Sequence, residues 1–155
     1  MPEIQHVHPI LVHFPIVLIY TLVVIDLVAL AGSNAVTMRS GVGTISTFVA
    51  IAAGLFAVAT WFFGGMALDY AEAAGFSSGV AEIHESLGTI SAFTFLSWGL
   101  VRLALWVRNR ELGTLALAIP AIEIAGAALV TVTGYYGGQL VYDLGVNVAK
   151  AAVGG

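Results

Sequence analysis

The residues of this chain best suited to metal chemistry are its four histidines, His6, His8, His13 and His84. Imidazole is the commonest protein ligand of transition metals, and it is also an axial ligand of haem iron. The chain contains no cysteine, which excludes thiolate metal sites, iron–sulfur clusters bound by this chain and covalent attachment of haem. A cofactor or metal ion must therefore be bound by histidine, carboxylate or backbone groups.

The elements that position these histidines follow from the hydrophobicity of the chain. Of its 155 residues, 59% are hydrophobic and 9% are charged, whereas soluble domains are roughly 45–50% apolar and about 25% charged. Four apolar stretches, at 9–31, 42–64, 84–107 and 112–133, approach or exceed the roughly 20 residues that a helix needs to cross a bilayer. Backbone groups in lipid must be satisfied within a helix, and short connections make consecutive spans antiparallel. The sequence thus predicts an all-α fold, an integral membrane four-helix up-and-down bundle in a single domain.

The distribution of cations predicts the orientation of this bundle. Arg39 lies between the first and second spans, and Arg108 and Arg110 lie between the third and fourth, whereas Lys150 is the only cation on the opposite side. Because loops rich in Lys and Arg stay in the cytoplasm, we expect both termini on the outer, periplasmic side of a prokaryotic cytoplasmic membrane. The net charge of −4 argues against nucleic acid as a partner and is compatible with a basic soluble protein.

The predicted site brings distant histidines together at the outer end of the bundle. His8 and His13 are five residues apart, so they point about 140° apart on a regular helix. His84 begins the third span, and the first and third spans of an up-and-down bundle begin on the same side. We therefore expect His13 to meet His84 across the bundle and to share one ligand with it. His8 would support that ligand or bind a further haem.

Residues near these histidines leave room for a planar cofactor. Gly88 and Ser91 lie on the same helical face as the third-span histidine, where the lack of bulk provides a patch for a porphyrin edge. Trp61 and Tyr135 are expected as interfacial anchors and, secondarily, as walls of the pocket. The glycines after the fourth span predict that residues 134–155 leave the helix and form a lid over the outer end. For the small residues, ordinary helix packing is the alternative interpretation.

Three charged residues lie deep within the spans. Asp26 and Arg102 are each five residues from the inner end of their span, so we expect them at equal depth and joined in a structural ion pair. Glu123 falls near the bilayer midplane. Three interpretations stay open for it: a protonated acid bound to a nearby hydroxyl group, a partner reached by Arg102, or a step in a proton path. The candidate hydroxyl groups belong to Tyr20, Thr94 and Ser97.

The histidine-bearing segments resemble those of a known family. The matching segments are His8-Pro9-Ile10-Leu11-Val12-His13-Phe14-Pro15-Ile16, the later His84, and Gly137-Gly138-Gln139-Leu140-Val141-Tyr142 with Gly145-Val146. They resemble the signatures of a widespread family of small four-helix prokaryotic membrane proteins, known as domain of unknown function twenty-two thirty-one. The resemblance spans nearly the whole chain and implies the four-span fold and the importance of His8, His13 and His84. It implies no settled activity, but members resemble companions of respiratory and other redox components, which raises the hypothesis of bound haem.

These observations favour a b-type haem-binding membrane protein that transfers electrons on the periplasmic side. His13 and His84 would be the axial ligands of the haem iron. The protein would be a subunit or companion of a redox complex rather than a stand-alone enzyme. Its electron partner would be a quinone or a periplasmic redox protein.

Two alternatives belong to other functional classes. In the first, the chain binds or transports a divalent metal ion, with zinc or iron held by His8, His13 and His84 together with Glu85 or Asp69. In the second, the chain is a structural subunit without a cofactor, which contacts other membrane subunits or a second copy of itself through small residues.

Overall fold

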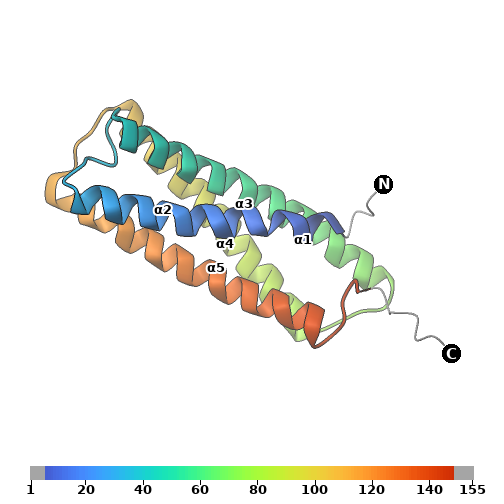
Figure 1. Cartoon of the computed structure of the whole chain (residues 1–155). Coiled ribbons are helices and arrows are strands. Elements are labelled where there is room, and N and C mark those ends of the chain that lie inside the picture. The colour runs from blue at the N-terminus through green and yellow to red at the C-terminus, as the bar shows by residue number, and fades with distance from the viewer. Residues whose placement is uncertain (1–5, 149–155) are drawn as a thin grey trace.

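A computed structural model describes residues 6–148 and shows a bundle of long helices (Figure 1). The helices are α1 (Val7–Leu11), α2 (His13–Ala31), α3 (Gly41–Ala73), α4 (Gly79–Val107) and α5 (Ala118–Tyr142), with the 3₁₀ helix η2 (Gly113–Leu117) before α5. By length and hydropathy, four helical segments can cross a membrane, and α1 with α2 forms the first of them. The described residues contain no β-strand. The predicted all-α, four-span membrane fold is therefore confirmed.

The first membrane-spanning segment is divided at Val12 into α1 and α2, but Val12 keeps helical backbone angles, with φ of −57° and ψ of −28°. Pro15 has no backbone N–H, so the carbonyl of Leu11 loses its usual helical partner at this point. His8 lies on α1, and His13 is the first residue of α2. Because the backbone at Val12 stays helical, the angle between the two histidines is close to that on a regular helix.

Serine side chains define where α3 and α4 begin. Ser40 Oγ accepts a hydrogen bond of 3.1 Å from the backbone N–H of Gly43, and Ser78 Oγ accepts one of 3.2 Å from Val80. Such caps satisfy N–H groups that have no partner within the helix. Between the two helices, Gly75 has a φ of 90°, which glycine adopts without strain and which turns the chain back. Because the chain reverses at Gly75, α3 and α4 pack side by side as antiparallel helices.

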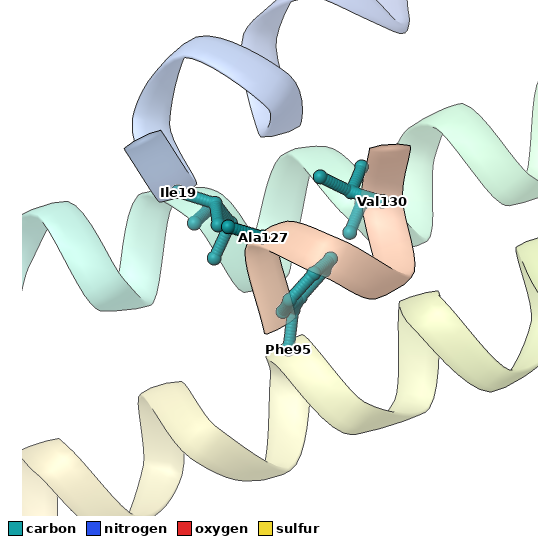
Figure 2. Close-up of a cluster of buried hydrophobic side chains, with 6 residues drawn as sticks. Ile19, Phe95, Ala127 and Val130 are labelled. Carbon is teal, nitrogen blue, oxygen red and sulfur yellow. The ribbon is translucent and has the colours of Figure 1, made fainter. Parts of the chain in front are cut away.

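Consecutive helices lie side by side, and α2 also packs against α5, so that the four spans close into a ring (Figure 1). In this ring α2 lies opposite α4, and α3 lies opposite α5. A small apolar cluster fills the centre and includes Ile19, Phe95, Ala127 and Val130 (Figure 2). The cluster lies at middle depth, and the polar residues gather at the two ends of the bundle.

Glycine allows α3 and α4 to come close. A Cβ atom added at Gly54 would lie 2.8 Å from the carbonyl oxygen of Phe95, and one added at Gly99 would lie 3.0 Å from that of Ala50. The obstructing atoms belong to the backbone, so the helices would have to move apart. We expect Gly54→Ala to lower the free energy of unfolding by about 1–3 kcal/mol, measured by denaturation in detergent. Gly65→Ala is the control because no atom lies within 4 Å of its Cβ; equal stability of the two variants would contradict the prediction.

The segment after residue 133 differs from the predicted lid. Helix α5 continues through several glycines to Tyr142, so residues 134–142 are helical. A helix satisfies backbone groups that an irregular segment would leave unpaired beside lipid, which explains why the glycines do not end it. Beyond α5, Asn147 Nδ2 donates a hydrogen bond of 3.3 Å to the carbonyl of Ala67 and ties the chain to α3. Residues 149–155 of the predicted lid lie outside the described part of the chain.

Candidate functional site

His8 and His84 meet at the end of the bundle where α1 and α4 begin. Their ring centres are 6.1 Å apart, and the ring planes are inclined by 82°. Both side chains are half-buried. The first and third spans lie on opposite sides of the ring of helices, so the two imidazoles approach each other across the bundle interior.

A backbone carbonyl of the following span orients each imidazole. His8 Nδ1 donates to the carbonyl of Thr60 in α3 at 2.9 Å, and His84 Nδ1 donates to that of Thr133 in α5 at 3.0 Å. A carbonyl can only accept, so each Nδ1 carries its proton and Nε2 of a neutral ring keeps a free lone pair. Within residues 6–148, neither Nε2 has a hydrogen-bond partner. Histidines that bind metals are typically oriented in this way.

A hollow between the four spans lies beside the histidine pair. Its cavity volume is about 80 Å³. Among the predicted site residues, Trp61, Gly88 and Ser91 line it together with the histidine pair. Ser91 Oγ lies 3.1 Å from Thr133 Oγ1, and the lining is otherwise mostly apolar. The hollow therefore offers an apolar site with two imidazoles.

The predicted meeting of His13 with His84 is not found, and His8 takes the place of His13. The side chain of His13 is exposed, and its Nδ1 lies 3.4 Å from the carbonyl of Ile10, a residue of the same segment. The physical reason is the angle between the two N-terminal histidines: when one of them faces the interior, the other faces outward. Tyr135, predicted as a pocket wall, is also exposed and does not line the hollow.

The acidic residues suggested for a metal-ion site do not gather around the histidines. Asp69 and Glu85 are exposed. Within the described residues, there is no group of three His, Asp, Glu or Cys side chains that could hold a metal ion. His8 and His84 are thus two imidazoles that could bind a metal, and no third metal-binding side chain of the described residues lies beside them.

The two imidazoles are bound by an internal repeat, which hydropathy and the histidine spacing alone do not reveal. A Thr-x-aromatic-aromatic-Gly-Gly motif occurs twice, as Thr60-Trp61-Phe62-Phe63-Gly64-Gly65 in α3 and as Thr133-Gly134-Tyr135-Tyr136-Gly137-Gly138 in α5. In each copy the threonine carbonyl accepts a hydrogen bond from the histidine of the preceding span. The first glycine of the pair lies against the same ring: an added Cβ would be 2.9 Å from His8 Cε1 at Gly64, and 2.8 Å from His84 Cε1 at Gly137. The two halves of the chain therefore present their histidines in the same manner.

Helical spacing is a second signal that identifies His8. His8 precedes Asp26 by 18 residues, and His84 precedes Arg102 by 18 residues. Eighteen residues are about five turns of 3.6 residues, so each histidine shares a helical face with the buried charge of its own span. His13 lies about 140° from that face. The sequence thus contained the information that His8, and not His13, faces the interior.

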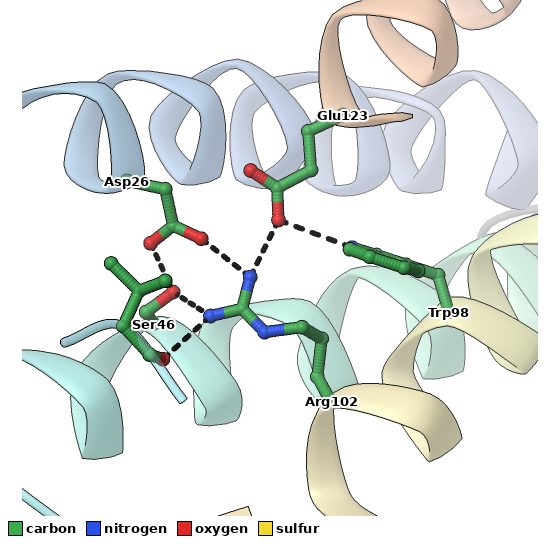
Figure 3. A network of polar contacts seen from close by, with 6 residues as sticks. Asp26, Ser46, Trp98, Arg102 and Glu123 are labelled. Atoms are coloured by element: carbon green, nitrogen blue, oxygen red, sulfur yellow. Dashed lines mark hydrogen bonds and ion pairs between the residues drawn. The ribbon is translucent and has the colours of Figure 1, made fainter. Parts of the chain in front are cut away.

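The opposite end of the bundle holds the second polar site (Figure 3). Arg102 Nη1 donates to Asp26 Oδ2 at 2.5 Å and to Glu123 Oε1 at 2.6 Å, and all three side chains are fully buried. The expected pairing of Asp26 with Arg102 is therefore present. Glu123 contacts Arg102, as one of the three interpretations of this acid expects. Glu123 Oε1 also accepts a hydrogen bond of 3.1 Å from Trp98 Nε1. Tyr20 instead pairs with a threonine hydroxyl of α5.

Comparisons with known proteins agree with the membrane fold and add no activity. None of the curated proteins and none of the solved structures matches this chain. The model of one family, DUF2231, described as a predicted membrane protein, matches residues 5–150. Since the match covers almost the whole chain, including both histidines of the pair and the buried polar site, the protein belongs to the DUF2231 family of predicted membrane proteins.

Proposed function

We propose that this protein is a b-type cytochrome module that binds haem through His8 and His84 and transfers electrons on the periplasmic side of a prokaryotic cytoplasmic membrane. The observation that carries this proposal is the geometry of the two imidazoles, whose ring centres are 6.1 Å apart. Two imidazoles on opposite sides of one metal have ring centres roughly 6 Å apart, since each metal–nitrogen bond is about 2 Å long. The free Nε2 atoms are the donors that such an arrangement requires.

The number of ligands favours haem over a bare metal ion. A structural zinc site uses four protein ligands, and a catalytic zinc site uses three. A porphyrin provides its own equatorial nitrogens, so two axial imidazoles from the protein are sufficient. Because the described residues contain no group of three metal-binding side chains, the histidine pair suits haem better than zinc or iron alone.

The hollow beside the histidines is smaller than a typical cofactor site. Its cavity volume is about 80 Å³, whereas cofactor sites typically measure about 300–1,000 Å³. Gly88 and Gly134 both line the hollow and have no atom within 4 Å of an added Cβ. A haem would therefore extend past these glycines, and the helices around the hollow would have to move apart to admit it.

Each residue of the site has a separate task in this proposal. The carbonyls of Thr60 and Thr133 fix the two rings and keep the proton on Nδ1, which makes Nε2 the ligand atom. The apolar lining excludes water and stabilises a flat apolar cofactor. Held by His8 and His84, haem would supply one-electron transfer. A quinone or a periplasmic redox protein would exchange the electron, and other membrane subunits would complete the redox complex.

Cations at the end of the bundle opposite the histidine pair support the proposed orientation. Arg39 Nη2 donates to the carbonyl of Val107 at 2.6 Å, so the connection after α2 lies beside the end of α4. Arg108 and Arg110 follow directly and are exposed. This end would face the cytoplasm under the positive-inside rule, and the histidine pair would then lie near the periplasmic surface.

Absorption spectroscopy with haem quantification tests the proposal. We expect protein purified in mild detergent, or reconstituted with haemin, to contain about one haem per histidine pair and to show visible bands that change on reduction. His8→Ala and His84→Ala should each abolish these bands. His13→Ala is the matched control and should retain them, because His13 is exposed and lies outside the hollow.

Two outcomes would contradict haem binding at this site. One is an unchanged spectrum in either His8→Ala or His84→Ala. The other is a colourless protein that contains stoichiometric zinc or iron without porphyrin, which would favour the metal-ion alternative. A colourless protein without metal, even after reconstitution, would favour a structural subunit of a larger membrane complex.

A further inference from the structure

The buried polar site lies at the end of the bundle opposite the histidine pair, and the proposed function does not use it. Its acidic and basic groups do not balance in charge. Side chains from all four spans face it: Asp26 from α2, Ser46 from α3, Trp98 and Arg102 from α4, and Glu123 from α5 (Figure 3). Two of them are carboxylic acids, and only one is a cation. With both acids ionised, the site would carry one net negative charge.

A net charge at this position would be costly. The side chains of Asp26, Arg102 and Glu123 have an exposed fraction of 0%. Taking an unbalanced charge out of water into a membrane-spanning bundle is strongly unfavourable, whereas a site of zero net charge avoids most of that cost. One bound proton makes the site neutral.

The hydrogen bonds indicate where the proton resides. Both oxygens of Asp26 accept hydrogen bonds, one from Ser46 Oγ and one from Arg102 Nη1. Glu123 Oε1 accepts from Arg102 Nη1 and from Trp98 Nε1, but Glu123 Oε2 is buried and has no partner among the described residues. An ionised carboxylate without donors on one oxygen is poorly stabilised there, whereas a neutral carboxylic acid group without a partner costs less to bury than a charge.

The internal repeat shows that Glu123 is an addition to a pair that is already balanced. Asp26 and Arg102 lie at equivalent positions of the two halves, 18 residues after the histidine in each. The threonines of the repeated motif are 73 residues apart, and the residue 73 positions before Glu123 is the buried Ala50. The first half thus has an apolar residue where the second half has an acid. Packing alone does not require an acid at that position.

We infer that Asp26, Arg102 and Glu123 form a proton-binding site, in which one proton is held by Glu123 at neutral pH. Arg102 Nη2 also donates to the carbonyl of Val36 at 2.9 Å, and Val36 belongs to the connection between α2 and α3. The site therefore lies directly beneath this connection, and the proton enters and leaves from that end of the bundle. Along either span, roughly 27 Å separates it from the histidine pair, at 1.5 Å per residue. The inference does not depend on bound haem.

Infrared spectroscopy of the full chain in detergent or in a bilayer tests the inference. We expect the wild type at neutral pH to show the carbonyl stretch of a protonated carboxylic acid, shifted to lower frequency in D₂O. The band should be lost in Glu123→Gln, which mimics the neutral acid in size and shape. It should also be lost in Asp26→Asn, because one remaining acid then balances Arg102 and becomes ionised.

Glu85→Gln is the matched control, since Glu85 is exposed and its removal should leave the band unchanged. Haem propionates, where present, contribute equally to all variants and cancel in the differences between them. The absence of the band in the wild type would overturn the inference without any variant. So would a band that survives in Glu123→Gln, whether or not Asp26→Asn yields folded protein.

Discussion

Replacing Arg102 with methionine is expected to lower the free energy of unfolding by about 3–5 kcal/mol, the usual cost of removing one partner of a buried ionic group. Arg102 is the only cation among the described residues that is buried, and it donates to groups on α2, α3 and α5 and on the connection between α2 and α3. Without it, Asp26 and Glu123 face each other in a site that water does not reach. Denaturation of the purified protein in detergent, followed by loss of helicity, measures the effect.

Charge balance distinguishes this effect from a simple loss of packing. In the triple variant Arg102→Met with Asp26→Asn and Glu123→Gln, no ionisable group remains in the site, so we expect most of the lost stability to return. Arg108→Met is the surface control, because Arg108 is exposed and such changes are usually within about 0.5 kcal/mol. If the triple variant is no more stable than Arg102→Met alone, the electrostatic explanation is wrong.

The fold and the buried ion pair could be predicted because hydropathy and depth are properties of single residues and single helices. Apolar runs of sufficient length must be helical in lipid, so their positions in the sequence predicted the four membrane-spanning helices. Asp26 and Arg102 were expected to pair because both lie five residues from the inner end of their spans. The position of Glu123 left several interpretations open, since whether an arginine reaches an acid depends on side-chain conformations that hydropathy does not describe.

The histidine that faces the interior was harder to predict because its identity depends on helix rotation. Depth favoured His13, which lies further inside the apolar run than His8. Rotation favours His8, since 18 residues are about five full turns and bring it to the same helical face as Asp26. Depth alone was therefore insufficient to choose between His8 and His13. The helical angle between each histidine and Asp26 was needed as well.

The glycines of α5 show a similar limit. Consecutive glycines such as Gly137 and Gly138 usually indicate the end of a helix, and this suggested a lid. In this bundle the helix continues, and Gly137 serves to admit the ring of His84. The sequence signal for that role is the repeated motif in α3, where Gly64 admits His8 in the same way. Comparison of the two halves distinguishes a glycine needed for packing from one that breaks a helix.

The two glycines provide the second large expected effect. We expect Gly64→Ala and Gly137→Ala each to weaken haem binding by about 10–100-fold, the usual effect of disturbing a group that orients a metal ligand. An added Cβ at Gly64 would lie 2.9 Å from both Cε1 and Nδ1 of His8, so the ring must turn away and lose its hydrogen bond to the carbonyl of Thr60. The affinity is measured by titrating haemin into the purified apoprotein and following its absorption.

The control variants separate this effect from a general effect of alanine. Gly65 and Gly138 directly follow the two critical glycines, and an added Cβ would meet no atom within 4 Å at Gly65 and only the ring of Tyr142, at 3.9 Å, at Gly138. Alanine at these control positions should leave haem affinity unchanged. A clash with a side chain that can turn costs less stability than one with the backbone, so Gly64→Ala should remain more stable than Gly54→Ala while binding less haem. Equal haem affinity in Gly64→Ala and Gly65→Ala would show that the position of the His8 ring does not control binding, because only the first substitution displaces that ring.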